Sequence, residues 1–410
     1  MTSTIPDNPT STGPAPTFRP DVSGVSGVGG PRGHHRVRRN PGAGLPAAAD
    51  GYTPAEGDLP LPRKLTFDPA DWQIIARFWH PVAYSDEITG GPTGATLLDK
   101  QLVIYRVDGE ITVADNLCTH RGMMLSLGED QHDGRGVKCP YHGLRFGAGG
   151  RCTEIPAHPT AKIPARMHLP AYGAVERYGL VWANLAAKPG DVPGVDTPTD
   201  IPPVPHWDED GYQRINCPGI DVGAFAGRQV EGFLDVAHFA FVHDRSFALS
   251  DNPVVPEYTP ERTADGFTTD YWSSMPNIPH DASPEVWDAV PEGFSWLRRF
   301  RLHVPFTATL DVFFPGGKHL AMMNAASPVS ATKTRLFDAR VRNFDTDQPV
   351  QDVYDFNLQV FEEDRAMVEA QKPENLPLDP TLEVHIPADR SSIAYRRALR
   401  DLGLSQFFTA

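Results

Sequence analysis

Residues 118–122 read Cys-Thr-His-Arg-Gly, and residues 139–143 read Cys-Pro-Tyr-His-Gly. Each stretch supplies one cysteine and one histidine, and eighteen residues separate His120 from Cys139. A [2Fe–2S] cluster of mixed ligation needs two thiolates on one iron and two imidazoles on the other, so two such loops meet its requirement. Neutral imidazoles raise the reduction potential of such a cluster and leave a ring N–H that can exchange protons. The two stretches therefore predict a cluster held by Cys118, His120, Cys139 and His142 in a small β domain.

A structural zinc ion bound by the same two cysteines and two histidines is the alternative. Common zinc fingers place both cysteines before both histidines, whereas each stretch here alternates the two residue types. Four cysteines in 410 residues are too few for a disulfide framework, which favours a reducing cytoplasm and a chemical role for the cysteines. We therefore favour the iron–sulfur cluster.

The composition indicates a globular protein of two or three domains, with 410 residues of which 40% are hydrophobic. A net charge of −15 disfavours nucleic acid and anionic membranes as partners, and apolar runs long enough to span a bilayer are missing from the sequence. Residues 1–62 contain eleven Pro and ten Gly, which predicts a disordered tail. The Pro-rich segment 189–205 is predicted to separate a β domain at 63–190 from a second unit at 191–410.

The second unit shows both helical and strand patterns. Apolar residues alternate with polar ones over 300–304 and 308–314, which predicts half-buried strands. Helical spacing predicts one helix over 221–242 and another over 350–370 that ends before Pro373. The unit is therefore predicted to be α+β.

A second group of candidate site residues, Asp235, His238 and His243, lies in the first of these helices. Asp235 and His238 would share a face, but five residues advance a regular helix by about 140°. The helix is therefore predicted to end or distort near His243. Non-haem Fe(II) oxygenases bind iron with two histidines and one carboxylate. The acidic run 362–364 offers that carboxylate, although from the residues alone Glu362, Glu363 or Asp364 could serve, or the run could be a solvated face.

The two cysteine–histidine stretches resemble the paired cluster loops of the Rieske non-haem iron oxygenases. The segments His80-Pro81-Val82-Ala83 and Gly179-Leu180-Val181-Trp182 are similar to flanking segments of that family. The resemblance covers about residues 65–400 and is nearest to the phthalate dioxygenase and vanillate O-demethylase-like branch. It implies an α+β protein in which an N-terminal Rieske [2Fe–2S] β domain precedes a C-terminal helix-grip (START/Bet v 1-like) catalytic domain, a curved antiparallel sheet around a long helix.

The resemblance also implies the roles of the second group of residues. It selects Asp364 as the third ligand of a mononuclear Fe(II), beside His238 and His243. It assigns Asp235 to the bridge between the two metal centres, which runs from His142 of one chain to Asp235 and His238 of the next. A head-to-tail ring follows, usually a homotrimer.

The function that the resemblance implies is that of the oxygenase (alpha) component of a mono- or dioxygenase. Such a protein uses O₂ to hydroxylate or O-demethylate an aromatic or other small organic substrate. The sequence has neither a Gly-rich dinucleotide fingerprint nor a further ferredoxin-like cysteine set, so the electrons must come from a separate NAD(P)H-dependent reductase or ferredoxin. Strands at 304–314 and 319–329 would line the substrate pocket, with Met322, Met323 and Asn324 as candidates.

Two other classes of protein remain as alternatives. A Rieske electron-transfer protein without oxygenase activity would need neither the 220 residues after position 190 nor the pair His238 and His243. A zinc-stabilised binding protein with the same pocket would be colourless.

Overall fold

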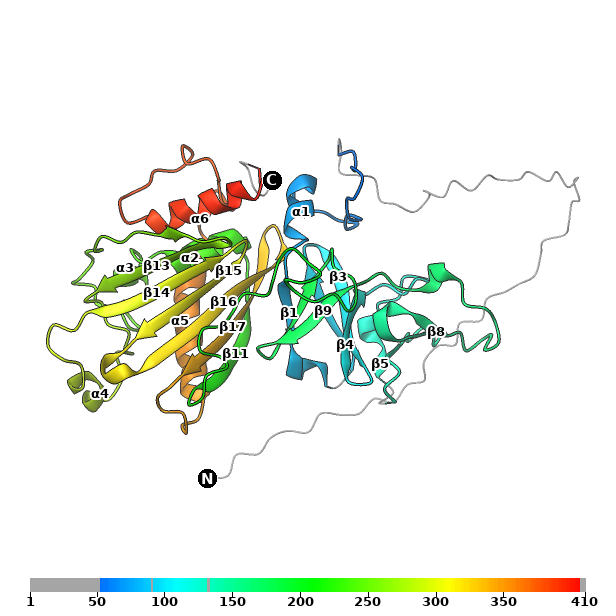
Figure 1. Cartoon of the computed structure of the whole chain (residues 1–410), viewed down its shortest axis with the longest axis horizontal. Helices are drawn as coiled ribbons and strands as arrows, with labels where there is room; N and C mark the ends of the chain where they lie inside the picture. Colours follow the sequence, from blue (N-terminus) through cyan, green and yellow to red (C-terminus); the bar gives the residue numbers. More distant parts are fainter. Residues whose placement is uncertain (1–51, 90, 131–132, 406–410) are drawn as a thin grey trace, which may run out of the picture. The chain divides into compact units, whose positions relative to one another are not determined.

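The computed structural model describes residues 52–89, 91–130 and 133–405. Most of the predicted tail, 1–62, lies outside these residues. Its last part is described: the Leu59 backbone N–H donates to Gln73 Oε1 at 2.8 Å, and the Gln73 amide donates back to the Leu59 carbonyl at 2.9 Å. Within the described residues the strands form three antiparallel sheets, one of them in the C-terminal half of the chain (Figure 1).

The N-terminal half contains a six-stranded and a four-stranded sheet. The six-stranded sheet has the order β1 (His80–Tyr84), β10 (Leu180–Asn184), β9 (Ala171–Arg177), β4 (Glu110–Asp115), β3 (Lys100–Val107) and β2 (Thr93–Leu97). The four-stranded sheet has the order β5 (Glu129–Asp130), β6 (Val137–Lys138), β7 (Arg145–Phe146) and β8 (Cys152–Glu154). Helix α1 (Pro69–Ile75) precedes both, and the Asp68 side chain caps it by accepting from the Ala70 N–H at 2.8 Å.

The C-terminal half is built on a seven-stranded sheet, which confirms the predicted strands around Phe300 and Leu310. Its order is β11 (Gln213–Val222), β17 (Lys333–Arg342), β16 (His319–Ser330), β15 (Thr307–Phe313), β14 (Trp296–His303), β13 (Gly266–Ser273) and β12 (Glu261–Arg262). The helices of this half are α2 (Ala226–Leu234), α3 (Phe239–Val242), α4 (Pro284–Asp288), α5 (Gln351–Val368) and α6 (Arg390–Asp401). Helix α5 confirms the helix predicted over 350–370.

Successive residues of β14 to β17 point to opposite faces of this sheet. We call the face that bears Leu310 and Met322 the inner face, because these residues line a cavity together with residues of α5. The outer face bears Met323 and Ala339, which pack in one apolar cluster with Trp182 of β10. The six-stranded sheet therefore packs against the outer face, and Tyr84 Oη adds a hydrogen bond to the Cys217 carbonyl at 2.5 Å.

The prediction of one helix over 221–242 is wrong in its extent. The first two residues of that range belong to β11, and α2 ends at Leu234 instead of continuing to Val242. Asp235 adopts an extended backbone with φ −80° and ψ 130°, and its side chain accepts from the Ala237 N–H at 2.8 Å. This local hydrogen bond competes with the helical pattern, so the chain turns before α3 begins.

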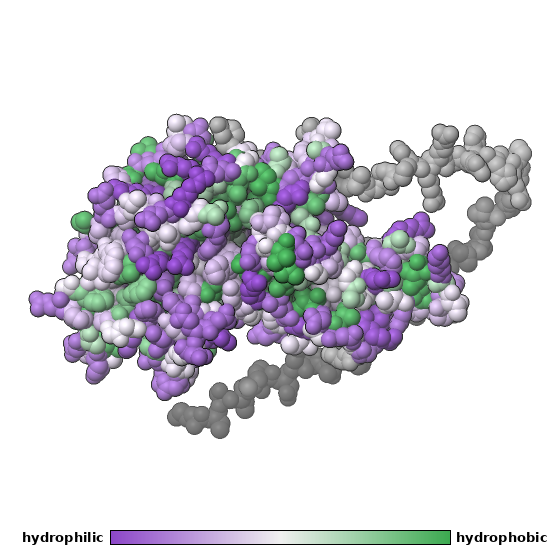
Figure 2. All heavy atoms as spheres, in the orientation of Figure 1, coloured by the Kyte–Doolittle hydropathy of each residue, from purple (hydrophilic) through white to green (hydrophobic). Residues whose placement is uncertain are grey.

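The surface agrees with the acidic composition. The face shown in Figure 2 is mostly hydrophilic, and its apolar patches are interrupted by polar side chains.

Among the described residues, none of the helices combines the length and the apolar character needed to cross a bilayer.

Candidate metal centres

The two cysteine–histidine loops have matching backbone geometry. In the first loop the Cys118 N–H donates to the Met123 carbonyl, and the Gly122 N–H donates to the Cys118 carbonyl, both at 2.8 Å. In the second loop Cys139 and Gly143 make the corresponding bonds, to Leu144 and Cys139, at 2.8 and 3.0 Å. Gly122 and Gly143 have φ values of 71° and 69°, which side chains other than glycine rarely adopt. The glycine that ends each stretch thus closes each turn.

The side chains of the two loops pair by type. Both thiols are buried, and burial together with the neighbouring Cys139 thiol raises the pKa of Cys118 to about 11. The His120 and His142 rings are exposed, with their centroids 4.6 Å apart. The two cysteine thiols are therefore buried side by side, and the two histidine rings are exposed side by side. A cluster with two thiolates on one iron and two imidazoles on the other requires this distribution.

The same pairing does not fit one zinc ion. With bonds of about 2.3 Å or less, a single zinc would bring its four ligand atoms within about 4.6 Å of one another. Two groups of three such side chains with ligand atoms within 4.8 Å occur among the described residues, and neither contains any of the four loop ligands.

The predicted iron ligands His238, His243 and Asp364 converge. His238 Nε2 lies 3.1 Å from His243 Nε2 and 3.5 Å from Asp364 Oδ1, and His243 Nε2 lies 3.2 Å from Asp364 Oδ1. Atoms at adjacent corners of an octahedron with bonds of about 2.1 Å are about 3 Å apart. The three atoms therefore fit one face of an octahedral iron site.

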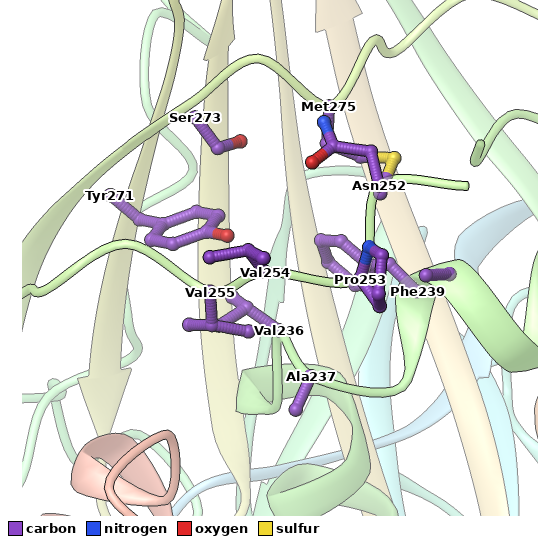
Figure 3. A pocket seen from close by; sticks show the side chains of 11 residues that line it. Val236, Ala237, Phe239, Asn252, Pro253, Val254, Val255, Tyr271, Ser273 and Met275 are labelled. Atoms are coloured by element: carbon purple, nitrogen blue, oxygen red, sulfur yellow. The ribbon is translucent and has the colours of Figure 1, made fainter. Parts of the chain in front are cut away.

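The break after α2 produces this convergence. Because the chain turns at Asp235, His238 immediately precedes α3 and His243 immediately follows it, so both rings face Asp364 on α5. Val236 and Phe239 of this segment also line, together with Val254 and Val255, a hollow of about 10 Å³ (Figure 3). A hollow of this size holds at most one water, so it reflects packing and not a binding site.

Carboxylates orient both histidine rings through their remote nitrogens. Asp235 Oδ2 lies 3.3 Å from His238 Nδ1, and the Asp235 side chain is 29% exposed. Glu363 Oε2 lies 2.9 Å from His243 Nδ1 and accepts from Ser246 Oγ at 2.8 Å. Such partners fix the ring orientation of metal-binding histidines.

The geometry also distinguishes the three acidic candidates of the sequence. The Asp364 carboxylate lies beside both histidine rings, whereas the Glu363 carboxylate contacts only His243. Glu362 forms an ion pair with Arg365 at 3.1 Å on a half-exposed face of α5. From the residues alone, the choice among these three carboxylates stays open. The orienting role of Glu363 is not predicted from the sequence, and its position next to Asp364 is the one sequence feature that could have indicated it.

A cavity of about 90 Å³ adjoins the convergent triad. Its walls are mainly apolar and come from α2, α3, the segment after α3, β15, β16 and α5: Phe233, Phe239, Phe247, Leu310, Leu320, Met322, Phe356 and Val360. Met322 lines the cavity, as expected. Met323 does not line the cavity, because the alternation along β16 turns its side chain to the outer face. Asn324 is fully buried on the inner face, but it does not line the cavity either.

Arg298 of β14 is the unexpected residue of this cavity. It is fully buried, and its acceptors among the described residues are neutral: Ser273 Oγ, Met275 O, Pro276 O and Asn277 Oδ1 at 3.3, 3.0, 2.6 and 3.4 Å. Burial lowers the pKa of Arg298 to about 10, so the side chain still carries a charge at neutral pH. Arg340 also lines the cavity but is neutralised by Asp338 at 2.7 Å. Side chains alternate between the two faces of β14, so Arg298 shares the inner face with Phe300 and Leu302. This alternation could have identified Arg298 from the sequence as a residue of the inner face.

Comparison with protein families gives two matches along the chain. Residues 78–172 match the Rieske [2Fe–2S] domain, and residues 223–404 match the vanillate O-demethylase oxygenase C-terminal domain. The first range contains both cluster loops, and the second contains the convergent triad. The second match favours an oxygenase over the Rieske electron-transfer alternative.

Individual proteins agree with both matches. Methylxanthine N1-demethylase of Pseudomonas putida is 30% identical over 348 residues, covering 80% of this chain and 90% of the relative. Dicamba O-demethylase, oxygenase component, of Stenotrophomonas maltophilia is 32% identical over 181 residues, covering 43% of this chain and 50% of the relative. The structure of Pseudomonas putida CBB5 NdmA with caffeine has a TM-score of 0.68 and 29% identity, over 80% of this chain and 91% of that chain.

These similarities and the two centres lead to one family. The chain belongs to the Rieske non-haem iron oxygenases, as a terminal oxygenase component that has a Rieske [2Fe–2S] cluster and a mononuclear iron and uses O₂ and electrons from a separate reductase to oxidise a small organic substrate.

Proposed function

We propose that His238, His243 and Asp364 bind the mononuclear iron, and that Cys118, His120, Cys139 and His142 bind the cluster. The convergence of the three iron ligand atoms within 3.5 Å carries this proposal. When bound, the iron supplies the activation of O₂ beside the cavity. The residues of the chain position the substrate, exclude water with their aromatic walls and orient the two histidine rings.

The domain division follows from the same assignment. We place the Rieske domain at 63–190 and the catalytic domain at 191–410, after a tail at 1–62. Two separate sets of strands, each with its own family match, support this division. Four free cysteines support the cytoplasm as the compartment.

We assign Asp235 to the electron path between the two centres. The exposed His142 ring and the partly exposed Asp235 carboxylate can meet across a subunit boundary, in a head-to-tail homotrimer. Asp235 would then accept hydrogen bonds from His142 of the neighbour and from His238 of its own chain.

The substrate that fits the cavity is a small aromatic molecule with one anionic group. The apolar walls suit an aromatic ring, and Arg298 supplies a buried cation whose hydrogen-bond acceptors among the described residues are neutral. A buried charge of this kind is costly until an anion compensates it. The reaction is hydroxylation or removal of a methyl group; the demethylases among the relatives support the second.

Metal analysis tests the assignment of both centres. Anaerobically purified protein is expected to contain about three irons and two acid-labile sulfides per chain and to give a Rieske EPR signal after reduction with dithionite. His238→Ala is expected to lose one iron and to keep the sulfide and the EPR signal. Zinc in place of iron, or an iron content that His238→Ala leaves unchanged, would contradict the proposal.

Replacing Arg298 by Met tests the anionic substrate. With a surrogate reductase, we expect the KM for a methoxybenzoate to rise about 100-fold, or about 2.7 kcal/mol, and the KM for the matching methoxybenzamide to change little. Initial rates of O₂ uptake give both constants.

The neighbouring strand residue provides the control for Arg298. Arg299 lies on the outer face and pairs with Asp270 at 2.7 Å, so Arg299→Met is expected to leave both KM values unchanged. Arg298→Lys keeps the charge and should recover part of the loss. An equal rise for acid and amide would show that Arg298 only holds the loop at 275–277 in place.

A further inference from the structure

A second cluster of metal-binding side chains lies away from both redox centres. His206, Asp311 and His319 each offer one ligand atom, and these atoms lie within 4.8 Å of one another. His206 comes from the segment before β11, Asp311 from β15 and His319 from the start of β16. His206 Nε2 lies 3.0 Å from Asp311 Oδ2.

The register of the sheet places this cluster on the outer face. Asp311 pairs with Ala321, and Phe313 pairs with His319, so Asp311 and His319 are diagonal neighbours on one face. Their immediate chain neighbours, Leu310 before Asp311 and Leu320 after His319, point to the inner face and line the iron cavity. The sheet therefore separates this cluster from the proposed iron site.

The Asp311 carboxylate has an unused acceptor. Its side chain is 9% exposed, and its Oδ1 atom is buried without a hydrogen-bond partner among the described residues. The nearest strand neighbour that could neutralise it is Arg299, which pairs with Asp270 instead through two bonds at 2.7 and 2.8 Å. A buried carboxylate oxygen of this kind is costly unless a cation or a donor reaches it.

Both histidines have a ring nitrogen engaged by an oxygen. His206 Nδ1 lies 2.8 Å from Glu209 Oε1, and His319 Nδ1 lies 3.2 Å from Tyr212 Oη. The Tyr212 ring also stacks on His206, with centroids 5.0 Å apart and an angle of 1° between the planes. A carboxylate on the far nitrogen of a histidine is the arrangement that orients metal-binding imidazoles.

We propose that His206, Asp311 and His319 form a site for a divalent cation of the zinc class, which fastens the segment before β11 to the outer face of the catalytic sheet. Two imidazoles and one carboxylate suit Zn²⁺, and water can fill a fourth position. Asp311 and Glu209 together supply two carboxylates, one as a ligand and one behind the His206 ring. The site would hold the junction between the two domains in place, independently of the catalytic iron.

Zinc binding to the iron-loaded protein tests this site. After incubation with Zn²⁺ and gel filtration, elemental analysis is expected to show one zinc per chain with the iron content unchanged. Asp311→Asn and His319→Gln are expected to weaken zinc binding about 100-fold or more, and Glu209→Gln about 10-fold. In the wild-type protein, zinc should raise the Tm by about 5 °C, whereas Asp311→Asn should show no shift.

His303→Gln is the matched control. His303 Nδ1 pairs with Asp265 Oδ2 at 2.6 Å in the same sheet, but this pair belongs to neither three-residue cluster of the described structure. His303→Gln should therefore bind zinc like the wild type. Zinc that enters only as iron leaves, or equal zinc in the wild type and Asp311→Asn, would overturn the proposal and leave a His206 that bridges two carboxylates without a metal.

Discussion

Asp364→Ala is expected to remove the mononuclear iron and to lower substrate oxidation by about 1,000-fold or more, equivalent to about 4 kcal/mol. The reason is geometric, because Asp364 Oδ1 is the atom that lies within 3.5 Å of both histidine nitrogens. Iron analysis, the EPR signal of the reduced cluster and O₂ uptake measure the result. The cluster signal should be unchanged, since Asp364 belongs to the other domain.

The two neighbours of Asp364 provide a graded control. Glu362→Gln removes an ion pair with Arg365 from a half-exposed face and is expected to change neither iron content nor rate. Glu363→Gln replaces the carboxylate that orients His243 with a neutral amide, which is a weaker acceptor, and a decrease of about 10- to 100-fold is expected. If Asp364→Ala kept its iron and Glu363→Ala lost it, the ligand assignment would be wrong.

Asp235→Asn is expected to lower steady-state turnover by about 100-fold while both metal centres stay loaded. Asn has the size of Asp, but one acceptor oxygen becomes an NH₂ donor. The side chain can then no longer accept from the Ala237 N–H, from His238 and, in the proposed trimer, from His142 of the neighbouring subunit together. Stopped-flow reoxidation of the reduced cluster, with substrate and O₂ present, is expected to slow by the same factor.

A second aspartate–histidine pair gives the control for Asp235. Asp265→Asn breaks the pair with His303 and is expected to leave cluster reoxidation unchanged. Loss of iron in Asp235→Asn would mean that Asp235 mainly orients His238. Normal reoxidation with full iron would remove Asp235 from the electron path.

The chemistry of the cluster loops could be predicted from the sequence because it is local. Cys118 and His120 are two residues apart, and the glycine that ends each stretch closes its own turn, so composition and spacing already describe the loop. The strands predicted around Phe300 and Leu310 were also local, because alternation of apolar residues reflects one buried face. Helix α5 followed from helical spacing in the same way.

The helix predicted to carry both Asp235 and His238 does not continue that far. Helical spacing suggested a shared helix face, whereas the Asp235 side chain captures the Ala237 N–H and ends the helix. Helix propensity and a side-chain hydrogen bond compete over less than one turn, and the sequence pattern does not show which of them prevails.

The sequence by itself determined the local features of this protein: the two cluster loops, the alternating strands and the residue types of an iron site. Only the tertiary structure decided which carboxylate of 362–364 lies beside His238 and His243, that Arg298 is buried in the cavity with neutral hydrogen-bond acceptors in the described part of the chain, and that His206 reaches Asp311 across 105 positions. The physical reason is that local motifs depend on the backbone within a few residues. Convergence of distant side chains depends on strand register, on which face a residue takes and on where a helix ends.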